Sequence, residues 1–364
     1  MHEEKIIYVG KDELKKLISD KLHKAGLSRE HADITADHLV YADSRGVHSH
    51  GAMRVEYYAE RISKGGINAA PKFTYTQTGP CTGVFDGDNG SGFVVAREGM
   101  FHAIDLAKQN GIGVVTMKRM SHCGTLSYYI RMAAAEGLIG ISMCQSDPMV
   151  VPYGGTSAFF GTNPIGFAAP REDGTPVVFD MATTVGAWGK ILDARSKGKE
   201  IPDTWAVDEH GHPTTDPFAV HGLLPIAGAK GYGLMMMVDI LSGILSGAPY
   251  GPHVTSMYSD LSEGRELGQI HIVINPDYFV GAKEFYKQLD ALVAELHKVR
   301  PAKWNEDGVS YPGERSDHKA QLSEERGIPI VENIYNYLVS DAIHFDRYEC
   351  GDPFAHTREP GKAQ

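Results

Sequence analysis

The chain has 364 residues, 42% of them hydrophobic and 22% charged, and its formal net charge is −11. This composition is typical of a globular protein, and the length favours about two domains over a single core. The acidic balance argues against nucleic acid as the main partner, because binding a phosphate backbone requires clustered lysine and arginine.

The first part of the chain is predicted to be helical. Its opening residues, MHEEKIIYVGKDELKK, contain no apolar core of the kind that a secretory signal peptide needs. Apolar side chains recur at helical spacing over residues 14–22, Ser28 can cap a second helix, and a third helix is predicted near 52–64. The fragment SRGVHSHG, residues 44–51, is therefore predicted to be a loop between two helices.

From about residue 80 the pattern changes to alternating strands and helices. The predicted strands are TGVFD, GIGVVTM, LIGISMC, IGFAAP and PVVFDMA, with helices near 92–109, 124–136 and 185–197. KGYGLMMMVDILSGIL is predicted to be a buried helix, QIHIVINP a buried strand, and the segment from Phe285 to Leu296 an amphipathic helix. IPIVENIYNYLVSDA is predicted to be helical, and the last 20 or so residues are expected to form a loose tail. The pattern indicates a mixed α/β protein.

Cysteine spacing and hydropathy indicate where the protein functions. The most apolar helical stretch, GLMMMVDILSGILSGA, is interrupted by Asp239 and is too short and too polar to span a bilayer. No two of the four cysteines form a Cys-x-x-Cys pair that would bind a metal or undergo redox exchange: Cys81, Cys123, Cys144 and Cys350. We therefore expect a protein of the reducing cytoplasm.

The common nucleotide-binding and hydrolase motifs are missing from the sequence. Gly-x-Gly pairs occur at 90/92, 111/113 and 231/233, but none continues to the third glycine of Gly-x-Gly-x-x-Gly. The sequence also lacks a Gly-x-x-x-x-Gly-Lys-Ser/Thr loop, a Gly-x-Ser-x-Gly elbow and His-Glu-x-x-His. If this protein binds a nucleotide, we expect it to use a less common fold.

His122, in RMSHCGT, lies where the strand GIGVVTMKRM ends and a helix begins. Ligands bind at such junctions in α/β proteins. The partial positive charge of a helix N-terminus disfavours the imidazolium form, which leaves a neutral imidazole that can accept a proton near neutral pH. The alternative is a histidine that only caps the turn through a local hydrogen bond, and the fragment alone leaves both interpretations open.

His48 and His50 lie two residues apart in the predicted loop. Such a pair can present both rings to one metal ion, but a site needs one or two further ligands, and Asp43 and Glu56 are the only carboxylates close in sequence. Because no complete set of ligands is visible, we predict no metal site. The alternative is that one ring faces solvent and the other packs between helices.

Three other residues each have a functional and a structural interpretation. Arg54, at the start of a predicted helix, could hold a carboxylate or form a surface ion pair with Glu56 or Asp43. Lys230, among the glycines of GAKGYG, could approach a ligand or only mark the start of an apolar helix. Asp180 ends the strand PVVFD, where it could meet a ribose hydroxyl or cap a helix.

Together these fragments resemble the malate/L-lactate dehydrogenase family of the second, non-Rossmann type, over about residues 10–340. The resemblance is carried by ADSRGVHSHG, MSHCGTLSYY, FFGTNPIGFAAP, FDMATT, GAKGYGLMMMVDILSG and YPGE. Within the family, HSHGAMRVEYYAERISKGG, ISMCQSDPMVVPYGG, IPDTWAVD, PTTDPFAVHGLLP and LGQIHIVINP resemble members that act on ureidoglycolate.

The resemblance implies an α/β fold that binds NAD without the Rossmann glycines, with helical N- and C-terminal parts around a mixed or antiparallel sheet. We accordingly expect a helical part over about residues 1–75, packed with C-terminal helices and tail over 279–364, and an α/β part over 76–278. The family is typically dimeric, with the cleft near the subunit interface, so a homodimer or higher homo-oligomer is expected.

The resemblance also implies roles for individual residues. His122 matches the proton acceptor of the family, whereas His50 and Arg54 match the substrate end of the site and His48 is expected to be structural. The positions that match cofactor contacts are Ser146, Asp180, Met181, Ala182, Lys230, Gly313, Glu314 and Arg315. The last two make the segment YPGERSD more charged than the family pattern.

The implied reaction is oxidation of (S)-ureidoglycolate, a 2-hydroxy acid of allantoin breakdown, to oxalurate with NAD. His122 would accept the hydroxyl proton, Arg54 would hold the carboxylate, and no metal ion is expected. One alternative is a related enzyme acting on malate, lactate, sulfolactate, diketogulonate or a ketimine. A more distant one is a metal-dependent hydrolase or lyase built on His48, His50 and a third ligand.

Overall fold

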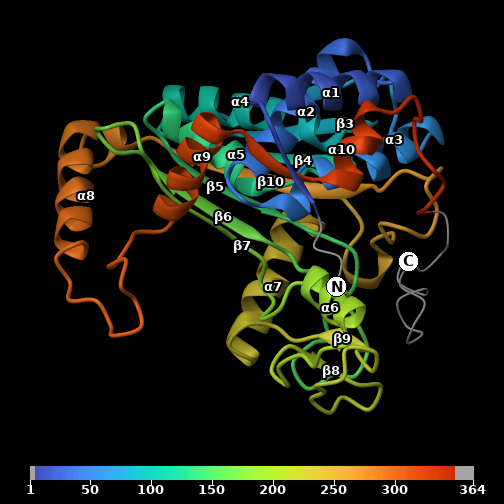
Figure 1. Ribbon diagram of the computed structural model, residues 1–364. Coiled ribbons are helices and arrows are strands. Elements are labelled where there is room, and N and C mark those ends of the chain that lie inside the picture. Colours follow the sequence, from blue (N-terminus) through green and yellow to red (C-terminus); the bar gives the residue numbers. More distant parts are fainter. Residues whose placement is uncertain (1–4, 349–364) are drawn as a thin grey trace.

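A computed structural model gives the structure of the protein and describes residues 5–348. A mixed seven-stranded sheet lies at its centre, in the order β2-β3-β4-β10-β5-β6-β7 (Figure 1). The strands, in that order, are β2 (Thr74–Gln77), β3 (Thr82–Gly90), β4 (Ile112–Met120), β10 (Leu267–Ile274), β5 (Ile139–Cys144), β6 (Ile165–Ala169) and β7 (Val177–Met181). Only β3 and β4 pair in parallel, so the prediction of a mixed sheet is confirmed.

The pairing register brings five strand ends to one edge of the sheet. β4 and β5 both run antiparallel to β10, and their last residues face the start of β10, where Leu267 pairs with Met120. Met143 near the end of β5 pairs with Ile165 at the start of β6, which in turn pairs with Met181 at the end of β7. Loops that follow β4, β5 and β7, or precede β6 and β10, therefore meet along this edge.

Helices cover both faces of the sheet, because alternate strand residues point to opposite sides. Val115 and Met117 of β4 pack in the core beneath α4 (Gly92–Asn110) and α5 (Leu126–Ala135). Their neighbour Val114 packs instead with Val238 of α7 (Ala229–Ser242) on the opposite face. Figure 1 shows α4 and α5 above the sheet and α7 below it.

The two ends of the described chain meet in a third layer of helices. α1 (Lys11–Ala25), α2 (Arg29–Ser44), α3 (Val55–Ser63) and α10 (Glu332–Val339) share one apolar core, and β1 (Ile6–Val9) pairs antiparallel with β11 (Ile328–Val331). The helix predicted for IPIVENIYNYLVSDA is therefore wrong in its first four residues. A short apolar run does not distinguish strand from helix, and here pairing with β1 decides it. The predicted boundaries near 75 and 278 stay a prediction.

The remaining elements are short or peripheral. They are α6 (Trp188–Lys197), β8 (Ala206–Val207), β9 (Gly222–Leu223), α8 (Ala282–Leu296), α9 (Glu314–Arg326) and 3-10 turns at His48–His50, Ala52–Arg54, Ile244–Ser246, Gly251–His253 and Pro276–Tyr278. Within residues 5–348, no helix combines the length and apolar character that crossing a bilayer requires. The predicted loose tail falls mostly on 349–364, outside the described residues, whereas 341–348 pack against the helices of the third layer.

Candidate active site

His122 lies at the sheet edge where the strand ends meet, between the end of β4 and the start of α5. Its Nδ1 lies 2.7 Å from the hydroxyl of Tyr58, and the Gly124 N–H donates to the same nitrogen at 3.2 Å. A Cβ on Gly92 would lie 2.1 Å from the carbonyl oxygen of Ser121, so only glycine lets α4 begin this close to the histidine. The Tyr58 hydroxyl can donate to Nδ1 or accept a proton from it, so it can hold the neutral ring in either tautomer, and Nε2 is the ring nitrogen that neither Tyr58 nor Gly124 contacts.

The pKa of His122 lies well below its ordinary value of 6.5, chiefly because burial disfavours the charged ring. The positive charges of Arg54 and Arg265, and the nearby rings of His50 and His38, lower it further. The sequence suggested the same direction through the helix N-terminus, but in the structure burial is the largest cause. The imidazole is therefore neutral at neutral pH, as a proton acceptor must be.

The two histidines of the opening loop have separate positions. The His50 ring stacks on His122 with centroids 5.8 Å apart, and burial lowers its pKa to about 4. His48 instead places Nδ1 2.9 Å from the buried carboxylate of Asp43, which also accepts the Ala52 N–H at 2.6 Å. A Cβ on Gly51 would overlap that carboxylate at about 2 Å, so the loop closes tightly around it. His48 thus holds the loop in shape, while His50 reaches the site.

Arg54 lies at the N-cap of α3, as the sequence predicted. Its Nε donates to the carbonyl oxygen of Ser49 at 2.8 Å, and its Nη1 donates to the hydroxyl of Tyr258 at 2.5 Å. The predicted surface ion pairs are not formed, because Glu56 faces Arg347 and Asp43 faces His48. The guanidinium is therefore held by neutral oxygens, and its charge is left for another anion.

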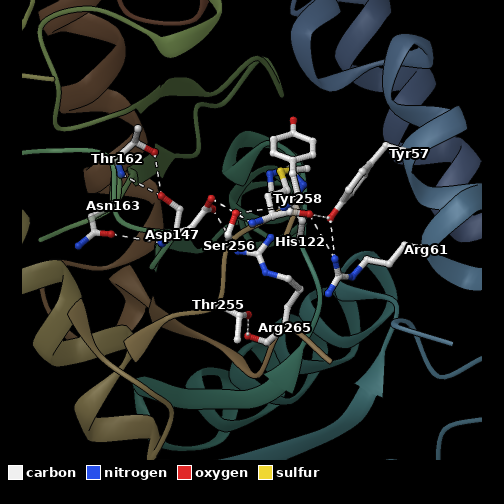
Figure 2. Close-up of polar contacts among 12 residues, drawn as sticks. Tyr57, Arg61, His122, Asp147, Thr162, Asn163, Thr255, Ser256, Tyr258 and Arg265 are labelled. Carbon is white, nitrogen blue, oxygen red and sulfur yellow. Dashed lines mark hydrogen bonds and ion pairs between the residues drawn. The ribbon is translucent and has the colours of Figure 1, made fainter. Parts of the chain in front are cut away.

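Arg265, which the sequence reasoning missed, brings a second cation to the site (Figure 2). The side chain is 1% exposed, and its Nη2 lies 3.1 Å from Asp147 on the loop after β5. Its Nε and Nη1 are buried and make no hydrogen bond to any residue between 5 and 348. In the sequence, SEGREL resembles a solvent-exposed loop, so only tertiary contacts could show that this arginine is buried.

Ser146 follows β5 at the same edge, beside the start of β6. Its hydroxyl lies 3.2 Å from that of Thr162 and accepts the Thr162 N–H at 2.9 Å, while its own N–H donates to Asn163. A Cβ on Gly161 would lie 2.2 Å from the Ser146 carbonyl oxygen, so the two loops touch through backbone. Ser146 is positioned at the strand ends where the resemblance requires a cofactor contact.

Asp180, Met181 and Ala182 lie at the end of β7, the outermost strand of the sheet. Asp180 accepts the Ser127 N–H at 2.8 Å, so it caps the start of α5 and not the helix that follows it in sequence. Met181 is 37% exposed although it lies within a strand. This stretch of edge strand therefore offers both a carboxylate and an apolar surface.

The segment from Gly313 to Arg315 lies alongside β7, because Val178 donates its N–H to the Pro312 carbonyl at 2.8 Å. Gly313 has φ of 98°, which favours glycine, and a Cβ there would lie 2.9 Å from the Val178 carbonyl oxygen. Glu314 accepts from His297 and from the Tyr311 N–H, and Arg315 donates to Asn305. The structure thus brings Gly313 next to Val178 of β7, two residues before Asp180, while the two charged side chains bind within their own region.

Lys230 is exposed in the first turn of α7, which carries no acidic residue. A cation near a helix N-terminus is electrostatically unfavourable unless an anion lies nearby, so this position fits a phosphate group. Gly231 must be glycine, since a Cβ would lie 1.7 Å from the Ile226 carbonyl oxygen, whereas a Cβ on Gly233 would meet nothing within 4 Å. Tight backbone packing therefore explains why residue 231 is glycine, but it does not explain the glycine at 233.

These residues fit a dinucleotide without the Rossmann fingerprint. Glycines at 161, 231 and 313 let backbone segments approach closely, and Lys230 supplies a cation in the first turn of α7. Gly161 lies at the strand ends that also carry His122, Gly313 lies beside the outermost strand β7, and Gly231 lies in the first turn of α7.

A family model described as malate/L-lactate dehydrogenase matches residues 9–339. The chain belongs to the malate/L-lactate dehydrogenase family. This membership confirms the family expected from the sequence fragments. It also explains why no Gly-x-Gly-x-x-Gly precedes a helix in this chain.

Relatives in the malate/L-lactate dehydrogenase family cover nearly all of the chain. A ureidoglycolate dehydrogenase (NAD(+)) of Escherichia coli strain K12 is 57% identical over 348 residues, which are 95% of this chain and 99% of that protein. The structure of malate dehydrogenase from Pyrococcus horikoshii OT3 matches with a TM-score of 0.83 at 37% identity, covering 92% of this chain and 94% of that one. Sulfolactate dehydrogenase from Methanocaldococcus jannaschii matches with a TM-score of 0.85 at 37% identity, covering 91% and 95%. The predicted fold class is thereby confirmed.

Proposed function

We propose that this protein oxidises (S)-ureidoglycolate to oxalurate with NAD. The observation that carries the reaction type is the neutral imidazole of His122 close to the cation Arg54, at the edge where strand ends meet. The 57% identity to a ureidoglycolate dehydrogenase (NAD(+)) supports the choice of substrate and cofactor. Such a reaction belongs to the breakdown of allantoin, in which ureidoglycolate carries purine nitrogen.

His122 accepts the proton of the substrate hydroxyl through Nε2, the ring nitrogen that Tyr58 does not contact. For Nε2 to accept, the ring's own proton must lie on Nδ1, where the Tyr58 oxygen is 2.7 Å away and can accept it. A hydroxyl both donates and accepts, so Tyr58 can stabilise either tautomer of the ring. Burial keeps the imidazole uncharged before the proton arrives.

Arg54 binds the carboxylate of the substrate, and His50 forms a hydrogen bond with a substrate oxygen. The guanidinium donates to the neutral oxygens of Ser49 and Tyr258, and its planar fork suits a carboxylate. Arg265 adds further positive potential at His122, and Asp147 balances part of the arginine charge. Both cations favour an anionic substrate.

The NAD would be held by the sheet-edge residues and by the first turn of α7. We assign this role to Ser146, Asp180, Met181, Ala182, Lys230, Gly313, Glu314 and Arg315. When bound, the nicotinamide ring supplies the acceptor for the hydride that leaves the carbinol carbon. The protein contributes orientation, exclusion of water and the proton acceptor.

The protein is further proposed to be a homodimer, with α7 in the interface. Five apolar side chains on α7 and the turn after it are between 37% and 58% exposed: Met236, Met237, Ile240, Ile244 and Leu245. A contiguous exposed apolar face of this kind marks a surface that a partner covers. Because α7 begins with Lys230, an interface here would lie close to the proposed cofactor contacts.

A cytoplasmic location completes the proposal. Cys81, Cys123 and Cys144 are free thiols, even though the sulfurs of Cys123 and Cys144 lie only 4.0 Å apart. Proteins of oxidising compartments use such pairs as disulfides, whereas thiols are retained in the cytoplasm.

A substrate panel tests the proposed function. The purified protein is incubated with NAD or NADP and with (S)-ureidoglycolate, malate, lactate or sulfolactate, and the absorbance of the reduced nicotinamide is followed. We expect the highest kcat/KM with ureidoglycolate and NAD. A preference for malate or sulfolactate would assign the chain to another activity of its family, and an inactive protein with tightly bound metal would favour a hydrolase.

A further inference from the structure

Residues 341–348 form a strap that returns from α10 to α3 (Figure 1). At its start, the Lys21 ammonium donates to the carbonyl oxygens of Ser340 and Ala342, both at 2.7 Å. The Tyr337 hydroxyl then donates to the Ile343 carbonyl at 2.6 Å. The strap follows the last residue that the family model matches, 339.

Side chains near the end of α3 fasten the middle of the strap. His344 lies 2.8 Å from the Ser63 hydroxyl, and Lys64 pairs with Asp346 at 3.1 Å and with the buried Glu60 at 2.8 Å. Glu60, His344 and Asp346 could together hold a metal ion, but the Lys64 ammonium already supplies a cation to both carboxylates. We interpret this cluster as an anchor for the strap.

The strap ends on the tyrosine that holds Arg54. The Tyr348 ring stacks on Tyr258, with centroids 5.9 Å apart and planes 19° from parallel, and meets the Tyr57 ring edge-on at 5.6 Å. Tyr57 packs edge-on against Tyr258 as well, at 5.4 Å. Tyr258 therefore contacts one ring from α3 and one ring from the strap, and those two rings also contact each other.

Tyr258 needs this support because its loop has no regular secondary structure between Val254 and Glu266. Side chains hold its backbone, because Met257 donates its N–H to Asp147 at 3.1 Å and Tyr258 donates its own to Ser256 at 3.2 Å. The neighbouring rings of Tyr57 and Tyr348 set the direction of the Tyr258 ring, and with it the place of its hydroxyl. That hydroxyl accepts from Nη1 of Arg54 at 2.5 Å. A shift of the Tyr258 ring would move the acceptor and release the guanidinium.

We propose that Tyr348 is a positioning residue for Arg54, acting through Tyr258. The inference rests on the proposed function, in which Arg54 binds the substrate carboxylate. Tyr348 touches no reacting atom, and its effect is to keep the arginine in one orientation before substrate binds. Preorganisation of this kind acts on substrate capture more than on the chemical step.

The test compares Tyr348→Ala with Tyr348→Phe, using (S)-ureidoglycolate and NAD. Tyr348→Ala should raise KM for ureidoglycolate roughly three- to tenfold, the factor expected for one aromatic pair, with kcat and KM for NAD changed by less than about twofold. Tyr348→Phe keeps the ring and should restore the wild-type KM. Tyr8→Ala removes an exposed tyrosine of β1 and serves as the matched control.

A double-mutant cycle separates positioning from general loosening of the fold. Tyr258→Phe removes the acceptor for Arg54, so adding Tyr348→Ala to it should raise KM little further. Additive effects, an unchanged KM in Tyr348→Ala, or equal losses in Tyr348→Ala and Tyr348→Phe would each overturn the inference. If Tyr348→Ala does not fold, Tyr348→Leu keeps the bulk without the aromatic ring, and the same KM comparison applies. A wild-type enzyme inactive on ureidoglycolate would instead overturn the proposed function.

Discussion

The hydroxyl of Tyr58 lies 2.7 Å from Nδ1 of His122, although 64 residues separate the two in sequence. Tyr58 belongs to α3, the helix that carries Arg54 at its N-cap, and His122 follows a strand of the central sheet. The helical layer therefore carries both the cation proposed to bind the substrate and a tyrosine in contact with the imidazole.

Replacement of Tyr58 by phenylalanine should lower kcat. The change removes the hydrogen bond to Nδ1, and a bond worth about 1 kcal/mol corresponds to a roughly five- to tenfold loss. KM should change less, since Tyr58 does not bind the carboxylate. Steady-state kinetics measure this, with Tyr8→Phe, an exposed tyrosine, as the control. An unchanged kcat would mean that the contact does not serve the proton transfer.

Replacement of Arg54 by lysine should chiefly raise KM for ureidoglycolate. Lysine keeps the charge but loses the planar fork that binds a carboxylate in two places, so roughly tenfold weaker capture is expected. The matched control is Arg29→Lys, because Arg29 pairs with Asp20 on the exposed surface. The carboxylate role is contradicted if KM in the Arg54 variant equals that of wild type.

Acid should destabilise the fold through its buried histidines. Burial lowers the pKa of His271 on β10 from 6.5 to about 4, so between these values the unfolded chain binds a proton that the folded protein does not. The free energy of unfolding should fall as pH drops through this range, by about 3 kcal/mol for His271 at pH 4. Denaturant titrations of wild type and His271→Gln, at pH 7 and pH 5, measure the difference. His210→Gln, an exposed histidine, is the control, and an equal pH dependence in wild type and His271→Gln would contradict the assignment.

Replacement of Ile240 by glutamate should dissociate the proposed dimer. Ile240 is 45% exposed in the apolar face of α7, and burying a carboxylate there without a partner is unfavourable. Sedimentation velocity should show a dimer for wild type and a monomer for the variant. Val299→Glu, at a residue that is 52% exposed near α8, should leave the dimer intact. A monomeric wild-type protein would contradict the proposed dimer.

Local motifs predicted the parts of the site that lie in unusual strings. His122 and Arg54 could be proposed from SHCG and HSHGAMR because both fragments lie at predicted element boundaries. Tyr58 and Tyr258 could not, since a tyrosine in a helix or polar loop is usual and its partner is set only by packing. Arg265 was missed for the same reason, because its burial comes from contacts with the loop after β5.

The fold shows the same division between local and distant causes. Strands such as β4 and β10 could be predicted from continuous apolar runs. β11 was read as helix because its strand character depends on pairing with Ile6–Val9, more than 300 residues away. The pairing order β4-β10-β5, which brings His122 and Ser146 to one edge, is likewise a tertiary property that periodicity does not contain.

The central claim is that His122 accepts the proton in an NAD-linked oxidation of ureidoglycolate. The most direct measurement is NADH production by wild type and His122→Ala, with NADH binding to both followed by fluorescence. We expect a roughly 10²- to 10⁴-fold loss of kcat in the variant with NADH affinity retained. Near wild-type turnover by His122→Ala would contradict it.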